Sequence, residues 1–173
     1  MTEYRRPQLL DPRAHDRRGF DCGEPVLNEW LHRFAGQNRR GNTAAIWVVV
    51  DHDNVVVAYA SLSMTAIDVS AASPPLAKNA PDPIPALLVG RLGVDRRHEN
   101  RGLGTALIAH VLATVLELNQ QAACRAVVVT AINESSRRWW EYLGFSPMDP
   151  DDPEALDLYL LTADIEATLR GLE

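Results

Sequence analysis

Residues 92–112 read LGVDRRHENRGLGTALIAHVL, in which a strand-like ending, a turn with two glycines and an apolar stretch follow one another. The run ALLVGRLGV at 86–94 predicts the strand, and a helix is predicted from Gly102 to Leu118. A turn between a strand and a helix directs free backbone N–H groups and the positive end of the helix dipole to one point. The segment therefore predicts an anion site, where Gly102 and Gly104 let a ligand approach the backbone closely.

Three arginines of this segment, Arg96, Arg97 and Arg101, would add positive charge to the predicted anion site. Two common phosphate-binding motifs nevertheless do not fit. A dinucleotide-binding turn needs a third glycine, where the chain has Leu107, and an acidic residue about 20 positions further on. A Walker loop needs Gly-Lys-Ser or Gly-Lys-Thr, and the sequence contains neither. A plain strand-to-helix turn without any ligand remains an equal alternative.

Strand-like runs and amphipathic stretches alternate along the rest of the chain. The predicted elements are a helix at 25–41, a hairpin of strands at 44–51 and 55–64, a loop with five prolines at 70–85, a strand at 125–131, a helix in 135–145 closed by Gly144, and a strand at 156–162. This order predicts an α/β fold with a mixed central sheet and helices on both of its faces.

Length and charge narrow the class of protein. A chain of 173 residues fits a single domain, residues 1–173. The net charge is −6, but nine acidic residues from Glu141 onward face only Arg170, so that residues 1–140 carry +2. Of the 17 basic residues all but Lys78 are arginines, which suit bidentate phosphate contacts. The charge permits a polyanionic ligand, and a codon usage that favours arginine explains the same count.

The sequence favours a cytoplasmic protein without a membrane segment. Cys22 and Cys124 have no CxxC or His-Cys spacing, so we expect neither a disulfide framework nor a metal site. No stretch approaches the roughly 20 apolar residues of a membrane span, and MTEYRRPQLL at the N-terminus lacks the apolar core of a signal peptide. A reducing cytosol is the natural compartment for such a chain.

The segment around the glycine turn resembles the GNAT family of acetyl-coenzyme A-dependent N-acetyltransferases, which carry Gln/Arg-x-x-Gly-x-Gly/Ala after a central strand. Residues Glu99 to Gly104 occupy this pattern. Glu99 departs from it, since it places an anion where the family has glutamine or arginine, and the neighbouring arginines would offset that charge. The resemblance implies that acetyl-CoA is held along the pantetheine arm by Leu92, Gly93 and Val94, and around the pyrophosphate by the amides of Asn100, Arg101, Gly102, Leu103, Gly104 and Thr105.

A second family pattern, Asn-x-x-Ala/Ser followed by Tyr-x-x-x-Gly-Phe, matches at Asn133, Ser136 and Gly144-Phe145. By the resemblance, Asn133 closes the coenzyme site. Asparagine is also a favoured residue at the start of a helix, so that a capping role explains Asn133 equally well. The two roles are compatible.

The family's tyrosine, which protonates the departing thiolate of coenzyme A, lies four residues before this glycine, and Trp140 stands there. Tyr142 points about 200° further around the helix and cannot simply replace it. We therefore expect Trp140 beside the thioester, where its indole N–H donates a hydrogen bond but releases no proton. Tyr142 stays the second candidate for catalysis, through an irregular helix end. Core packing explains Trp139, and it explains Trp140 as well as catalysis does.

The strand at 86–94 offers only Arg91 as a polar side chain, so the chain shows no clear general base. A lysine amine with a pKa of about 10.4 is hard to deprotonate without one, whereas an α-amino group, near 7.7 to 8.0, is already partly neutral. Orientation alone then lowers the barrier by several kcal/mol. The predicted site suits a weakly basic amine.

The stretch FDCGEPVLNEWLHRFAGQNRRGNTAAIWVVVD at 20–51 resembles the acetyltransferase toxins of bacterial toxin–antitoxin modules, and the likeness extends over most of 18–145. The resemblance implies acetylation of the α-amino group of aminoacyl-tRNA, inhibition of translation and neutralisation by a ribbon-helix-helix antitoxin, and it leaves a homodimer open. Candidates for contacts with the tRNA phosphates are Arg39, Arg40, Arg91, Arg96 and Arg97. For Arg39 and Arg40, charges at the end of a helix are an equal explanation.

Two other functions stay open at this point. A metabolic N-acetyltransferase for a small amine would share every coenzyme feature and need no RNA surface. A non-catalytic acetyl-CoA binding module would explain both Glu99 and the missing tyrosine.

Overall fold

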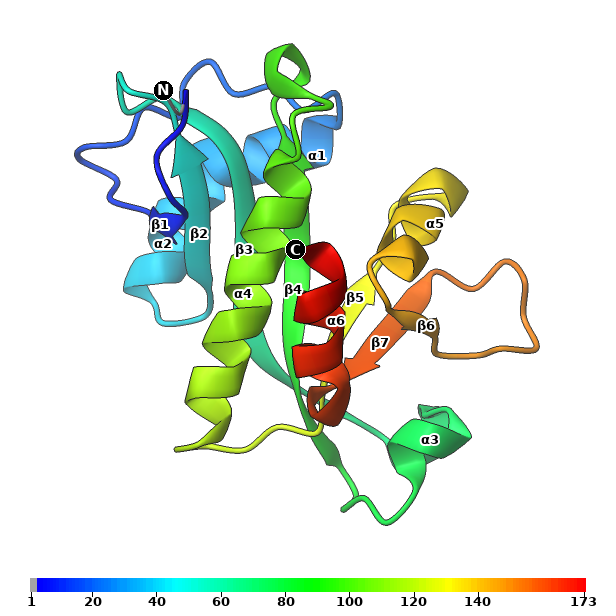
Figure 1. Ribbon diagram of the computed structural model, residues 1–173. Helices are drawn as coiled ribbons and strands as arrows, with labels where there is room; N and C mark the ends of the chain where they lie inside the picture. Colours follow the sequence, from blue (N-terminus) through cyan, green and yellow to red (C-terminus); the bar gives the residue numbers. More distant parts are fainter. Residues whose placement is uncertain (1–2) are drawn as a thin grey trace. The chain divides into compact units, whose positions relative to one another are not determined.

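Residues 3–173 are described by a computed structural model, which has the predicted mixed α/β architecture (Figure 1). Its strands are β1 (Gln8–Leu9), β2 (Ala45–Val50), β3 (Val56–Ile67), β4 (Ile84–Val94), β5 (Ala126–Thr130), β6 (Ser146–Pro147) and β7 (Asp157–Leu161). They form one sheet in the order β1-β2-β3-β4-β5-β7-β6. β4 and β5 are parallel, whereas β1–β2, β2–β3, β5–β7 and β6–β7 are antiparallel pairs.

The helices follow the predicted order, with additions. They are α1 (Pro25–Glu29), α2 (Ala35–Arg40), α3 (Pro74–Ala77), α4 (Leu103–Asn119), α5 (Glu134–Tyr142) and α6 (Ile165–Leu172). A π-helical segment, Trp30–Phe34, joins α1 to α2, so the predicted helix at 25–41 is irregular in its middle. Among residues 3–173 no helix is long and apolar enough to cross a membrane.

The chain divides into two compact units. The first consists of the residues up to Ser63 with Gly90–Val111, and the second of Met64–Val89 with Leu112–Glu173. β3, β4 and α4 contribute residues to both units. One domain over residues 1–173 stays a prediction.

In the first unit, alternate residues of β2 point to opposite faces, as the period of a strand requires. Ile46, Val48 and Val50 pack in a buried cluster with Trp30, Leu31 and Ala35 of the helical segment. Trp47, in between, contacts His110 of α4 at a ring distance of 4.5 Å. The β2 strand is therefore covered by helices on both faces, which explains why its sequence is apolar without alternation.

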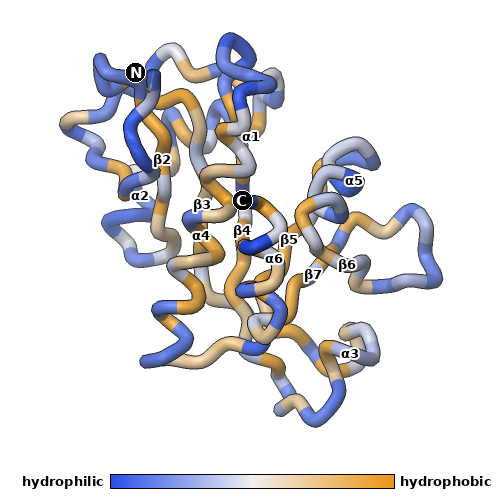
Figure 2. Tube along the Cα trace, viewed as in Figure 1, coloured by the Kyte–Doolittle hydropathy of each residue, from blue (hydrophilic) through white to orange (hydrophobic). Residues whose placement is uncertain are grey.

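In the second unit, β5 is buried in the same way. Ala126 and Val128 belong to a cluster with Leu76, Ile84 and Tyr159, and the alternate residues Val127 and Val129 are buried as well. Figure 2 shows the resulting apolar colour along β5, in contrast to the hydrophilic loop between β6 and β7.

Several elements were not predicted. The segment at 70–85 is not the uninterrupted loop expected from its prolines, because it contains α3 and the first residues of β4. Pro74 begins α3, where a proline's missing N–H costs no hydrogen bond. The strands β1 and β6 were not predicted either, because two residues are too short to give a periodic pattern. The terminal helix α6 was also not predicted.

Candidate acyl-coenzyme A site

The glycine turn has the backbone of an anion cradle. Asn100 and Gly102 have positive φ values of 60° and 75°, and the first hydrogen bond of α4 runs from the amide of Ala106 to the carbonyl of Gly102 at 3.0 Å. The amides of Leu103, Gly104 and Thr105 precede that bond and have no acceptor within the helix. A Cβ built on Gly102 would meet no atom within 4 Å, so the space beside this backbone is open to a ligand.

The predicted coenzyme residues in the first unit lie in one continuous stretch. Leu92, Gly93 and Val94 end β4, Asn100, Arg101 and Gly102 form the turn, and Leu103, Gly104 and Thr105 open α4. This backbone fits a pyrophosphate, because a helix N-terminus and a residue with positive φ present N–H groups to one point.

A buried carboxylate supports the start of this stretch. Asp95 is 1% exposed and accepts hydrogen bonds from Nε and a terminal nitrogen of Arg97, at 3.0 and 2.9 Å, and from the backbone amide of Arg97 at 2.9 Å. A fourth bond comes from the amide of Asp21 at 3.1 Å. Burial raises the pKa of the Asp95 carboxyl, but the hydrogen bonds from Arg97 and Asp21 outweigh burial and hold it at about 2.

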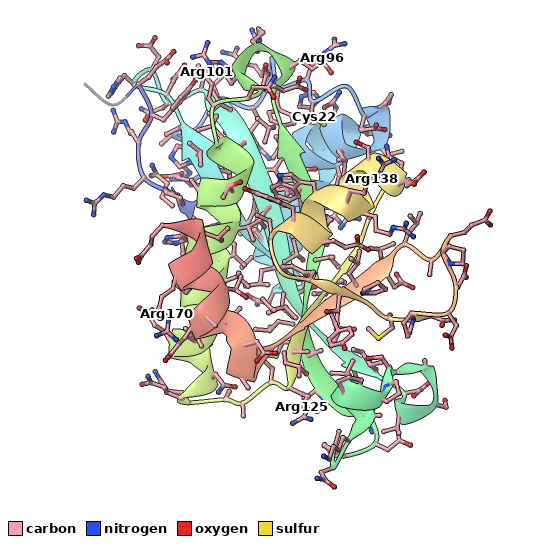
Figure 3. All side chains as sticks on the ribbon, turned by 45° about the vertical axis from the view of Figure 1, so that its right-hand side comes forward. Cys22, Arg96, Arg101, Arg125, Arg138 and Arg170 are labelled. Carbon is pink, nitrogen blue, oxygen red and sulfur yellow. The ribbon has the colours of Figure 1, made fainter. Side chains whose placement is uncertain are left out.

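The three arginines of the turn are not free cations, in contrast to their predicted role. Arg96 pairs with Asp21, and Arg97 pairs with Asp95 at 2.9 Å. Arg101 donates to Glu3 at 2.7 Å and to the Tyr4 hydroxyl at 2.7 Å. Figure 3 shows Arg96 and Arg101 at this end of the first unit. Each positive charge is thus partly neutralised by an acidic residue from the chain's first hundred positions, and the cradle relies chiefly on its amides.

The remaining arginine candidates lie elsewhere in the first unit. Arg91 stacks over the ring of Trp30, with its guanidinium carbon 4.4 Å from the ring centroid. Arg39 and Arg40 occupy the last turn of α2, as the helix-end explanation requires. The structure therefore does not gather the five predicted tRNA contacts into one group of unpaired charges.

The Phe-Asp-Cys-Gly motif packs against the end of β4, a contact that sequence reasoning missed. The Asp21 carboxylate accepts from the amide of Gly23 and from the Asn28 side chain, both at 2.9 Å, and the Asn28 side-chain oxygen accepts from the amide of Cys22. A Cβ on Gly93 would lie 3.2 Å from the Cys22 sulfur. Burial raises the pKa of the Cys22 thiol, which makes it a packing group rather than a nucleophile.

In the second unit, Asn133 is the N-cap of α5, and its side-chain oxygen accepts from the amide of Ser136 at 2.9 Å. The capping role of Asn133 is therefore confirmed, and a role toward the coenzyme stays a prediction. Trp140 is 4% exposed and packs edge-to-face on Phe145, with ring centroids 5.0 Å apart. Trp139, which was expected in the core, is only half-buried.

Tyr142 is 83% exposed. The α5 helix is regular through Tyr142, so the described segment shows no irregularity up to Tyr142 that would bring its hydroxyl to the leaving thiolate. Tyr142 instead lines a cavity of about 610 Å³ with Gly144 and Thr168. The burial of Trp140 agrees with core packing, and the catalytic roles of Trp140 and Tyr142 both stay predictions.

Comparison with known proteins identifies the class. Residues 10–145 match the model of the Acetyltransferase (GNAT) family. The chain belongs to this family, and it is an acetyltransferase that uses acetyl-CoA as its acetyl donor.

Individual relatives of the chain carry more specific descriptions than the family does. The chain is 30% identical to a tRNA-acetylating toxin of Mycobacterium tuberculosis over 169 residues, which cover 98% of this chain and 99% of that protein. A mutant of KacT superposes with a TM-score of 0.88 and 25% identity, covering 96% of this chain and 99% of that one. AtaT complexed with acetyl-methionyl-tRNAfMet has a TM-score of 0.83 and 25% identity, with 93% and 96% covered. An AtaT mutant bound to acetyl-CoA and the C-terminus of the antitoxin AtaR shares the fold at 24% identity, a TM-score of 0.81 and coverage of 96% and 98%.

Proposed function

We propose that this acetyltransferase transfers the acetyl group of acetyl-CoA to the α-amino group of an aminoacyl-tRNA and thereby inhibits translation. The observation that carries the proposal is the 30% identity to a tRNA-acetylating toxin over nearly the whole of both chains. The complex of AtaT with an acetylated initiator tRNA supports the same substrate class. The absence of an obvious base on β4 agrees with it, because an α-amino group is partly neutral near pH 8.

The chain's own residues have separate tasks in this proposal. Acetyl-CoA, when bound, supplies an acetyl group activated as a thioester. The amides of Leu103, Gly104 and Thr105 hold the pyrophosphate, and the open space beside Gly102 admits it. Trp140 donates its indole N–H to the leaving thiolate sulfur, and the proton of the attacking amine goes to water. Asn133, besides capping α5, closes the coenzyme site.

The proposal extends to partners and compartment. The cytoplasm is the compartment, since charged tRNA is found there, and an antitoxin of the ribbon-helix-helix class neutralises the chain. AtaT is bound by the C-terminus of AtaR, which supports a segment-type inhibitor. The chain acts as one domain.

The proposal is tested by incubating the purified chain with radiolabelled acetyl-CoA and a set of charged tRNAs. Free amino acids, polyamines and a lysine peptide serve as competing acceptors. We expect label on aminoacyl-tRNA that is released by deacylating the tRNA, and no label on uncharged tRNA. Expression in cells should arrest growth, and co-expression of the gene's neighbouring reading frame should restore it.

Other outcomes select the alternatives. Label on a small amine but on no charged tRNA would identify a metabolic N-acetyltransferase. Binding of acetyl-CoA by calorimetry, without label on any acceptor, would identify a non-catalytic binding module. The substitution of Trp140 for the family's tyrosine makes that last outcome worth measuring directly.

A further inference from the structure

Two arginines of the first unit lie together without an acidic partner. The guanidinium groups of Arg17 and Arg40 converge on Gly36: a Cβ built there would be 3.4 Å from a terminal nitrogen of Arg40 and 3.8 Å from one of Arg17. Within residues 3–173 neither arginine forms an ion pair with a carboxylate. Arg17 is half-buried and donates to the carbonyl of Leu31 at 3.1 Å, which fixes one edge of its guanidinium.

This arrangement costs energy in the free protein. Burial, and then the charge of Arg40, lowers the pKa of Arg17, as expected when two cations are held close together. Gly36 lies inside α2, where glycine weakens a helix relative to alanine. The space left by its missing side chain is bordered by the guanidinium groups of both arginines.

A cavity adjoins the pair. It has a volume of about 330 Å³, and its lining includes Arg13, Arg17 and His15. Arg13 is exposed and likewise has no ion pair in the described part of the chain. The one acidic residue in the lining, Asp16, is paired with Arg18, whereas Asp11 lies outside the lining and keeps its charge. The unpaired charge at this cavity is therefore positive.

We propose that Arg17 and Arg40, with Arg13 beside them, bind a phosphate of the nucleic-acid substrate. The inference rests on the proposed function and names the surface that this function requires. Guanidinium groups bind phosphate oxygens in a bidentate manner, and a phosphate placed between Arg17 and Arg40 removes their mutual repulsion. The arginines after β4 are less suited to this task, since Arg96, Arg97 and Arg101 are held by acidic residues.

The test uses Arg17→Gln, Arg40→Gln and the double variant. Arg18→Gln and Arg33→Gln are matched controls: they remove the same charge from the same segments, but from arginines paired with Asp16 and Glu29. Binding of tRNA is measured by fluorescence anisotropy at several salt concentrations. Each substitution at the pair should weaken binding roughly tenfold, and the slope of log K against log salt should fall by about 1 per lost phosphate contact.

Enzyme kinetics and a variant at Gly36 distinguish an effect on tRNA binding from an effect on folding. The pair variants should raise KM for aminoacyl-tRNA and leave kcat and the affinity for acetyl-CoA unchanged. Gly36→Ala should raise thermal stability, because alanine favours the helix, and leave tRNA binding unchanged, because its Cβ would only make van der Waals contact with Arg40 at 3.4 Å.

Several outcomes would overturn the inference. Equal losses in the pair variants and the controls would mean that only overall charge matters. Unchanged tRNA binding in the double variant, or a loss confined to antitoxin binding, would show that Arg17 and Arg40 do not bind the RNA. The proposed function would still stand. If the wild-type chain binds and acetylates no tRNA, both proposals are wrong.

Discussion

The buried carboxylate of Asp95 accepts a hydrogen bond from the backbone amide of Asp21, which lies 74 positions earlier in the chain. This bond joins the Phe-Asp-Cys-Gly motif to the residue that follows β4 and precedes the glycine turn. A second connection is the ion pair between Arg96 and Asp21. The N-terminal motif thus holds the residues just before the glycine turn in place.

Asp95→Asn should destabilise the fold by about 2 to 4 kcal/mol at neutral pH, because it removes the charge of a buried acceptor to which Arg97 and the amide of Asp21 donate. The measurement is denaturant unfolding. Asp16→Asn is the control: its pKa is also about 2, but its side chain is 35% exposed, against 1% for Asp95, so it should lose much less. Equal losses would mean that burial of Asp95 is not what makes its bonds matter.

The same carboxylate predicts a dependence of stability on acid. Its pKa in the folded chain is about 2, below the ordinary value of 3.8, so its ionised form stabilises the fold above that ordinary value. The contribution, roughly 2 kcal/mol, is lost as the pH falls from about 4 toward 2. In Asp95→Asn this part of the acid transition should be absent, and an unchanged acid profile would contradict the assignment.

Gly102→Val should abolish most acetyl-CoA binding, since φ is 75° there and the open space beside the glycine is where the ligand approaches. A β-branched residue at this φ also costs about 1 to 2 kcal/mol of stability. Gly104→Val should act in the same direction by crowding the first turn of α4. Gly171→Ala, a position that also has open space but lies in α6, should leave affinity unchanged by calorimetry. Wild-type affinity for acetyl-CoA in Gly102→Val would mean that the coenzyme does not bind at this turn.

Glu3→Gln should strengthen acetyl-CoA binding two- to fivefold, roughly the worth of an exposed ion pair. The reason is that Glu3 holds Arg101 at 2.7 Å, so the substitution returns a positive charge to the turn. The gain should shrink at high salt, because screening weakens exposed charges. Glu29→Gln, which frees Arg33 in the same unit, is the control and should change nothing. A loss of affinity in Glu3→Gln would mean that this contact supports the cradle.

The parts of the fold that depend on local pattern could be predicted from the sequence. The helix of α4, the β2–β3 hairpin and the strands β4, β5 and β7 follow from apolar runs bounded by turn residues. The two-residue strands β1 and β6 were missed because their pairing is decided by tertiary contacts. The π-helical turn at Trp30–Phe34 carries no periodic signal that differs from an ordinary helix.

The candidate site was predictable in its backbone but not in its charges. A glycine turn before an apolar helix predicts where amides point, since only neighbouring residues are involved. Whether Arg101 is free depends on Glu3, 98 positions away, and no local pattern reports that contact. Arg17 and Arg40 were separable from the other arginines only once the space over Gly36 was known.

On α5, Trp140 is buried against Phe145, whereas Tyr142 is exposed. Trp140→Phe keeps an aromatic ring but removes the indole N–H. Loss of a hydrogen bond to the thiolate, at about 1.5 to 3 kcal/mol, predicts a transfer rate lower by roughly tenfold to a hundredfold. The smaller ring should also reduce stability by about 1 to 2 kcal/mol. Acetylation of charged tRNA is therefore measured well below the unfolding temperature of the variant.

Tyr142→Phe is the matched control on the same helix. Its hydroxyl lies on an 83% exposed side chain, so neither the rate nor the stability should change. A Trp140→Phe variant that loses stability but keeps the wild-type rate would show that Trp140 only packs on Phe145, and water would then be the donor to the leaving thiolate. A large loss of rate in Tyr142→Phe alone would reverse the assignment, because it would require α5 to unwind near its end when the substrates bind.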